Sequence, residues 1–158
     1  MFVTFHEHII RVSQGPQDGI TSEDLWKALL EFVRRPHFYV EHLTNSQIIS
    51  EKPQENGTRF ERQLNFDKIK VEDVVDALPE SKTIITHVKP SSQYPESSLL
   101  IRIEEPEADT LFIRFIYEEE QHDENPLLQD LRRQAYEAKD QHLVEGLLSW
   151  IMEKKKHS

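Results

Sequence analysis

Apolar residues are spaced as in a strand at the start of the chain and as in a helix soon afterwards. The segment from Phe2 to Ser13 mixes β-branched and aromatic residues with polar ones, which predicts a strand. Further along, Leu25, Leu29 and Phe32 recur at the three- and four-residue spacing of a helix. Pro36 should end this helix, because the residue before a proline avoids the helical region of backbone conformation. A short second helix or turn is expected after it.

The connection between this strand and this helix carries turn and capping signals. The segment from Ser13 to Gly19 reads SQGPQDG and is predicted to be a loop. Thr21 stands three residues before Asp24, which is a variant of the capping box with aspartate in place of glutamate. We therefore expect the helix to begin directly after Thr21.

Six further segments rich in β-forming residues follow, and a turn signal separates each from the next. The predicted strands are Gln47–Lys52, Thr58–Phe66, Lys68–Leu78, Lys82–Val88, Ser98–Glu104 and Thr110–Glu118. Short strands at such regular intervals indicate an antiparallel meander rather than a parallel sheet.

The last segment, roughly Asn125 to Lys156, is predicted to be one long helix. It contains no proline after Pro126, and a proline fits the first turn of a helix. A helix of about thirty residues would be ~45 Å long, and it is the only predicted element able to cover one face of a seven-stranded sheet. The sequence thus predicts an α+β fold in which a curved seven-stranded antiparallel sheet wraps around a long C-terminal helix, with one or two short helices after the first strand. Residues 1–158 are expected to form one domain whose last few residues are a disordered tail.

Charge and composition exclude several classes of function. The formal net charge is −10 and the only basic run is Lys154 to Lys156, so we expect neither nucleic-acid binding nor attraction to anionic membranes. No apolar run is long enough for insertion into a membrane. The absence of cysteine excludes disulfides and thiolate metal sites, and four glycines are too few for a Gly-rich phosphate loop. We expect no signal peptide, a cytoplasmic location and no cofactor.

Three stretches of the sequence are similar to those of a known family. They are FHEHIIRV near the N-terminus, ITSEDLWKALLEFVRRP after it, and SLLIRIEEPEADTLFIRFIYE further on. The order of elements resembles the START-like (SRPBCC, helix-grip) superfamily, which includes the birch-pollen allergens and aromatic polyketide cyclases. More narrowly, the three stretches resemble the AtaL-like branch, whose domains occur in bacteria and fungi. The resemblance covers nearly the whole chain and implies a helix-grip fold with a cavity, but it implies no particular substrate.

Alternation along the predicted strands indicates which side chains face that cavity. In the last two strands Arg102 and Arg114 mark the outward face, so the residues beside them in the sequence point inward. The inward residues assigned to a ligand pocket are Phe60, Leu64, Ile101, Ile103, Ile113, Phe115 and Tyr117.

Arg62 falls on the same face of its predicted strand as Phe60 and Leu64, among apolar neighbours. Burying an unpaired guanidinium costs several kcal/mol, so Arg62 must meet a carboxylate, a carbonyl, a ligand anion or the rim of the sheet. Two structural alternatives are that it reaches water at the sheet edge or that a bulge redirects it. We include Arg62 both in the pocket and among the catalytic candidates.

His6 and His8 share one face of the first predicted strand, two residues apart. Two imidazoles at this spacing can bind one metal ion, but spacing alone is weak support, and hydrogen-bonded structural histidines are commoner. We therefore expect no metal and assign both side chains to the pocket.

A stripe of small residues runs along the predicted C-terminal helix. Ala135, Ala138 and His142 are three and four residues apart, which places them on one helix face. The alanines would leave room between helix and sheet for a ligand, so all three residues are assigned to the pocket.

Three classes of function stay open at this point. The favoured class is a binding module that holds a small apolar or aromatic metabolite in the cavity. The second is an enzyme of secondary metabolism, a cyclase, dehydratase or isomerase, in which Arg62 steadies a developing oxyanion or enolate. In that case one of His142, His87 or Tyr117 would handle the proton. The third is a co-chaperone-like interaction domain, which an exposed apolar patch would support.

Overall fold

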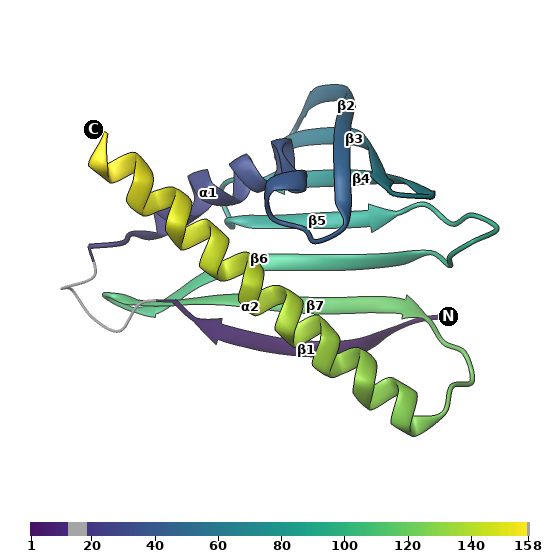
Figure 1. Ribbon diagram of the computed structural model, residues 1–158. Coiled ribbons are helices and arrows are strands. Elements are labelled where there is room, and N and C mark those ends of the chain that lie inside the picture. The colour runs from purple at the N-terminus through teal and green to yellow at the C-terminus, as the bar shows by residue number, and fades with distance from the viewer. Residues whose placement is uncertain (13–18, 158) are drawn as a thin grey trace.

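The computed structural model describes residues 1–12 and 19–157, and these form one antiparallel sheet and three helices (Figure 1). The strands are β1 (Phe2–Arg11), β2 (Leu43–Gln54), β3 (Gly57–Phe66), β4 (Ile69–Leu78), β5 (Thr83–Val88), β6 (Ser97–Glu107) and β7 (Thr110–Glu120). The helices are α1 (Ser22–Arg34), the short 3-10 helix η2 (Pro36–Phe38) and α2 (Pro126–Lys156). This architecture confirms the predicted α+β helix-grip class.

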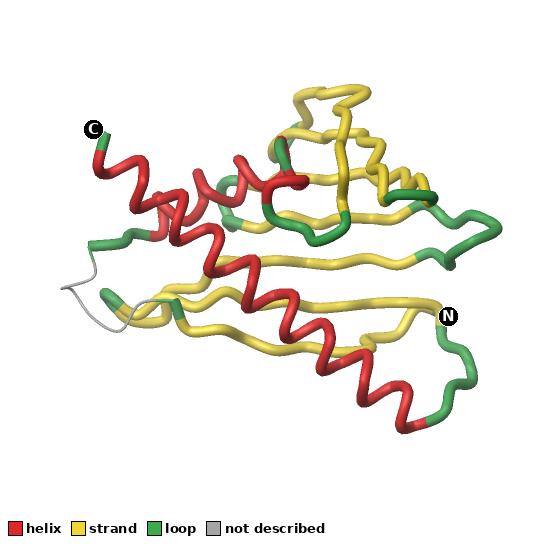
Figure 2. Tube along the Cα trace, viewed as in Figure 1, coloured by secondary structure: helices red, strands yellow, loops and turns green. Residues whose placement is uncertain are grey.

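The sheet follows the chain in order from β2 to β7, and β1 pairs with β7 at the far edge. All six neighbouring pairs are antiparallel, as the meander predicted. A tight turn joins β3 to β4, where Asp67 adopts a left-handed backbone conformation with φ 42°, which aspartate tolerates better than most residues. Most loops lie at the two ends of the strands, and α2 crosses the face of the sheet, with α1 and η2 beside it (Figure 2).

Several strands are longer than the sequence predicts. β2 begins at Leu43 instead of Gln47, and β6 continues to Glu107 through residues expected to form a loop. Pairing with a neighbouring strand, rather than hydrophobic alternation, sets these ends, because polar residues continue the hydrogen-bonded ladder. Most of the loop predicted from Ser13 to Gly19 lies outside the described residues, as does the end of the predicted first strand at Ser13.

The capping box predicted for α1 is confirmed. The Thr21 hydroxyl accepts a hydrogen bond from the Asp24 backbone N–H at 3.0 Å, and the Asp24 carboxylate accepts one from the Thr21 N–H at 3.0 Å. The apolar face of the helix buries Leu25 and Leu29 completely. The helix ends before Pro36, which is itself buried and begins η2. α1 therefore fills one end of the space beneath α2.

α2 crosses one face of the sheet diagonally (Figure 1), and four of its five buried residues lie in its C-terminal half. The apolar residues of that half that are buried are Leu143, Val144, Leu147 and Ile151. They join the side chains of α1 and of the central strands in one core. In the N-terminal half, Leu127, Leu128 and Leu131 are exposed instead.

Candidate functional site

A cavity of about 630 Å³ lies between the sheet and the N-terminal half of α2. The apolar residues that line it come mainly from β3 to β6 and from the segment around η2; they include Pro36, Val40, Leu43, Leu64, Phe66, Ile69, Val71, Val88, Leu99 and Ile101. Its charged and phenolic side chains are Arg62, Asp73, Tyr94, Tyr117, Glu118, Glu119, Arg132, Tyr136 and Lys139. The wall is thus mainly apolar, with polar groups at a few places, as in most small-molecule sites.

Arg62 and Asp73 form a buried ion pair in the wall of the cavity. They lie opposite each other in β3 and β4, and their side chains are 5% and 1% exposed. The guanidinium binds the carboxylate with two hydrogen bonds, Nε to Oδ1 at 2.9 Å and Nη2 to Oδ2 at 2.7 Å. Its Nη1 donates at 2.7 Å to the Val33 carbonyl, one of the carbonyls left free at the C-terminus of α1. Arg62 therefore has a carboxylate and a carbonyl as partners and does not reach water at the sheet edge.

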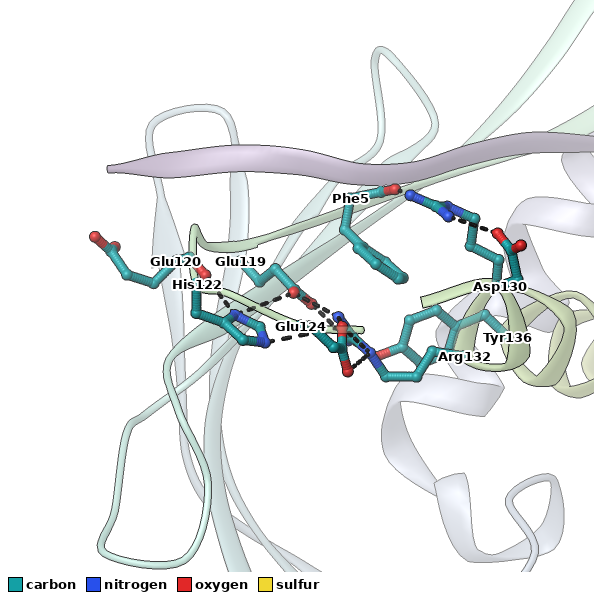
Figure 3. A network of polar contacts seen from close by, with 9 residues as sticks. Phe5, Glu119, Glu120, His122, Glu124, Asp130, Arg132 and Tyr136 are labelled. Carbon is teal, nitrogen blue, oxygen red and sulfur yellow. Dashed lines mark hydrogen bonds and ion pairs between the residues drawn. The ribbon is translucent and has the colours of Figure 1, made fainter. Parts of the chain in front are cut away.

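Arg132 is held in a second charged network where the cavity meets the start of α2 (Figure 3). Its guanidinium binds both carboxylate oxygens of Glu119, at 2.8 and 2.7 Å, and also binds Glu124, at 2.7 Å for the shortest contact. The guanidinium carbon lies 3.9 Å from the centre of the Phe5 ring. The hydrogen bonds to Glu119, followed by those to Glu124, raise the pKa of Arg132 above its ordinary value. The charge of Arg132 is therefore paired with carboxylates of the protein itself.

Tyr117 connects the cavity to a buried carboxylate. Its hydroxyl donates to Asp140 of α2, 2.7 Å from both carboxylate oxygens, and the Asp140 side chain is 1% exposed. His8 of β1 contacts the same carboxylate through Nε2 at 2.7 Å, and its ring stacks on Phe115 with centroids 5.1 Å apart. Burial, together with the charge of Asp140, raises the pKa of Tyr117 above its ordinary value, so this phenol stays protonated and acts as a donor.

Lys139 stands beside two aromatic rings at the cavity wall. Tyr117 and Tyr136 stack in parallel with centroids 4.2 Å apart, and the Lys139 ammonium lies 5.0 and 5.2 Å from those centroids. Lys139 keeps a large free surface, yet protein surrounds it closely enough that burial lowers the pKa of its ammonium below the ordinary value. Lys139 thus has an exposed surface as well as close protein neighbours, and it borders the cavity.

Eight of the predicted pocket residues are buried in or near this region. Those that line the cavity are Arg62, Leu64, Ile101 and Tyr117. Those that belong to the buried core and do not border the cavity are Phe60, Ile103, Ile113 and Phe115. Alternation along the strands thus identifies the inward face, while the position of the cavity depends on where α1 and α2 leave space.

The structure corrects the predicted face of α2. Ala135, Ala138 and His142 are exposed and do not border the cavity. The residues of α2 that border it are Arg132, Tyr136 and Lys139. The small size of alanine favours the other stripe, but the helix faces the cavity with long, polar and aromatic side chains. These reach across a wider gap than alanine can, and the cavity is the space they leave.

The predicted histidines lie outside the cavity wall. His6 and His8 are largely buried, and they contact Glu137 and Asp140 of α2 at 2.8 and 2.7 Å. The side chain of His87 is 45% exposed and contacts Glu96 at 2.9 Å. Of the four catalytic candidates, the structure brings Arg62 and Tyr117 to the cavity and leaves His87 and His142 away from it.

Most of the polar residues of the site were not predicted from the sequence, although Asp73 and Asp140 carry a usable signal. Asp73 alternates with Val71 and Val75, which marks an acid on an inward face, as Arg62 was marked. Asp140 stands three residues before Leu143, on the apolar face of the helix. Lys139 carries no such signal, since a lysine on a helix ordinarily reaches water.

Within residues 1–12 and 19–157, no three histidine, aspartate or glutamate side chains are grouped as ligands for a metal ion. No helix among the same residues is long and apolar enough to cross a membrane.

Three solved structures with this architecture share little sequence with the chain. The Zhui aromatase/cyclase from Streptomyces sp. R1128 is 10% identical, with a TM-score of 0.62 over 96% of this chain and 94% of that one. Ara h 8.0201 is 13% identical, with a TM-score of 0.60 over 97% and 99%. The di-domain aromatase/cyclase StfQ of the steffimycin biosynthetic pathway is 13% identical, with a TM-score of 0.65 over 100% of this chain and 53% of its own. At these identities the likeness establishes the fold alone.

The sequence matches a family model but no individual protein of curated function. Residues 11–156 match the family described as AtaL, acetylaranotin biosynthesis cluster protein L. The match extends over almost the whole domain, including every element that lines the cavity, and it agrees with the helix-grip architecture of the structure. The chain therefore belongs to the AtaL family.

Proposed function

We propose that this protein binds an apolar or amphipathic small molecule in the cavity between the sheet and the N-terminal half of α2. The observation that carries the proposal is the cavity itself, whose volume of about 630 Å³ and mainly apolar wall are typical of small-molecule sites. The helix-grip fold is also typical of hydrophobic-ligand binders and of polyketide aromatase/cyclases. Burial of the ligand's apolar surface would supply most of the binding free energy.

The state of the catalytic candidates favours binding over catalysis. Arg62 uses three of its N–H donors on Asp73 and Val33. Tyr117 donates a hydrogen bond to Asp140, and its raised pKa makes the phenol a weak acid and its phenolate form scarce. A general acid or base needs a pKa near the working pH and a free path to the substrate. Both residues instead give the cavity a fixed shape and polarity.

Native mass spectrometry of freshly purified protein tests this proposal. We expect a bound small molecule that organic extraction releases. A matched pair of variants locates it, because Leu99 borders the cavity while Leu100, its neighbour in β6, does not. The variant Leu99→Trp should lose the bound mass, and Leu100→Trp should keep it. Equal occupancy in the two variants, with both folded, would contradict the proposed location.

A second candidate function, an enzyme of secondary metabolism, is favoured by one observation: Tyr117 joins the cavity to the buried Asp140 and through it to His8. The description of the family, which names a biosynthesis cluster, supports the same setting. In this case the Tyr117 O–H would turn from Asp140 to donate a hydrogen bond to a substrate oxygen, and His8 would remain as the partner of the Asp140 carboxylate. Comparison of metabolites made by cells carrying the wild type or Tyr117→Phe tests it. If the protein is an enzyme, cells carrying Tyr117→Phe should lack a product that wild-type cells make, although the variant still binds the co-purifying molecule. If the two sets of metabolites are the same, Tyr117 is not catalytic.

A further inference from the structure

The cations of the cavity wall differ in their partners. Arg62 is matched by Asp73, and Arg132 by Glu119 and Glu124. Among the described residues, Lys139 has neither a carboxylate within ion-pair distance nor a hydrogen-bond acceptor on the protein. Its neighbours are the Tyr117 and Tyr136 rings, whose faces attract a cation but offer no lone pair in the direction of the ammonium N–H bonds.

An ammonium in this position has donors available for a ligand. Lysine carries three N–H donors and no acceptor. Removing such a group from bulk water without an anionic partner is unfavourable, and the lowered pKa of Lys139 is a sign of that. Because Lys139 borders the cavity, a molecule inside it can supply the missing acceptor. The nearest carboxylate in sequence, Asp140, is already occupied by Tyr117 and His8.

We propose that the molecule bound in the cavity carries an anionic head group, a carboxylate, that pairs with Lys139 while its apolar body lies along the strand residues of the wall. This inference rests on the proposed function, since it names the chemical class of the molecule that the cavity binds. The head group would give an acceptor to Lys139, the cation of the wall that has none among residues 1–12 and 19–157, and Leu99, Val71 and Phe66 would cover the body. A hydrogen bond to a charged group contributes about 1.5–3 kcal/mol, or roughly 10- to 150-fold in affinity.

A ligand paired with Glu118 would carry a positive head group, whereas a ligand paired with Lys139 carries a negative one. Glu118 also borders the cavity, and its carboxylate forms no ion pair with Lys139 among the described contacts. If Glu118 selected the ligand, an ammonium head group would bind best. Lys139 is the stronger candidate because its ammonium lies beside the Tyr117 and Tyr136 rings of the cavity wall. Glu118 is half-buried and follows Tyr117 in β7, where alternation directs successive side chains to opposite faces.

Competition against a neutral fluorescent probe tests the head group directly. N-phenyl-1-naphthylamine, which is apolar and uncharged at pH 7, would report occupancy of the cavity. Three competitors share one aromatic body and differ in the head group: 2-naphthoate, 2-naphthamide and 2-naphthylmethylammonium. With the wild type we expect naphthoate to displace the probe at a concentration at least tenfold lower than naphthamide, and the ammonium to be the weakest.

Variants assign that preference to Lys139. In Lys139→Met the tenfold preference for naphthoate over naphthamide should vanish, and in Lys139→Arg, which keeps the charge, it should persist. The control is Lys154→Met on the same helix, where the ammonium lies 5.3 Å from the Trp150 ring at an exposed position, and there the preference should be unchanged. Circular dichroism of each variant establishes that it is folded.

The outcomes separate this inference from the proposed function. If the wild type binds no neutral probe at all, the proposed function fails, and the head-group assignment fails with it. If the probe binds but naphthoate and naphthamide compete equally, or the ammonium competes best, only the head-group assignment is overturned. A preference for naphthoate that survives in folded Lys139→Met also overturns it, because the anion would then be bound elsewhere.

Discussion

The N-terminal and C-terminal halves of α2 lie against the same sheet but present different surfaces to it. The C-terminal half contributes Leu143, Val144, Leu147 and Ile151 to a continuous core with α1. The N-terminal half contributes Arg132, Tyr136 and Lys139, which border a cavity. One helix therefore closes the core at one end and forms a wall of the binding space at the other.

This difference shows how the fold separates stability from binding. Apolar burial by the C-terminal half stabilises the helix against the sheet, so the N-terminal half need not fill the space beneath it. Hydrogen bonds and ion pairs between α2 and the first and last strands hold that half instead, through His8, Asp140, Arg132 and Glu119. The cavity can then remain open without loosening the helix.

The largest expected effect comes from the ion pair that holds the cavity wall opposite α2. The variant Arg62→Met leaves the Asp73 carboxylate buried without its partner, and we expect the free energy of unfolding to fall by about 3–5 kcal/mol. Chemical denaturation measures it. In the double variant Arg62→Met/Asp73→Asn, which removes both charges, part of the loss should be recovered. A loss below about 1 kcal/mol in the single variant would mean that water reaches the pair.

The next effect tests the C-terminal half of α2. Leu147 is 0% exposed, so Leu147→Ala should lower the free energy of unfolding by about 2–5 kcal/mol through lost burial and a new void. Leu131, in the N-terminal half of the same helix, is 50% exposed, and Leu131→Ala should change it by no more than about 0.5 kcal/mol. Equal losses for the two variants would contradict the division of the helix.

The smallest expected effect is a gain in the free energy of unfolding, and it concerns Lys139. Burial lowers the pKa of its ammonium below the ordinary value of 10.5, so the folded state holds this proton less tightly than the unfolded state. The resulting destabilisation is fully present below the folded pKa and is relieved as the pH rises towards 10.5. In the absence of ligand, Lys139→Met should therefore be more stable than the wild type at pH 7, by a margin that shrinks with rising pH. Thermal unfolding between pH 7 and about 10 measures it, and a variant less stable than the wild type at pH 7 would contradict the account.

The sequence predicts the order of elements because each depends on local signals: alternation in the strands, Thr21 and Asp24 at the start of α1, and Pro126 at the start of α2. Alternation also places Arg62 on the inward face, where the structure has it. The partner of Arg62 depends on register, since Asp73 is opposite it only when β3 and β4 pair as they do. No local pattern contains that information.

The face of α2 over the cavity was not predictable from hydrophobic spacing. In the C-terminal half, apolar residues recur every three or four positions and mark the buried side. In the N-terminal half the apolar Leu127, Leu128 and Leu131 are exposed, and the inward stripe is polar and aromatic. A pattern rule applied there selects the wrong face, because the helix borders a cavity rather than a packed core.

A methyl NMR titration with N-phenyl-1-naphthylamine tests the central claim, that the space under the N-terminal half of α2 takes up an apolar molecule. We expect the largest shifts at Val71, Leu99 and Ile101, which border the cavity, and little change at Leu147 and Ile151 in the sealed core. Shifts centred on the exposed methyl groups of Leu127, Leu128 and Leu131, with the cavity methyl groups unmoved, would place the probe on the surface and contradict the account.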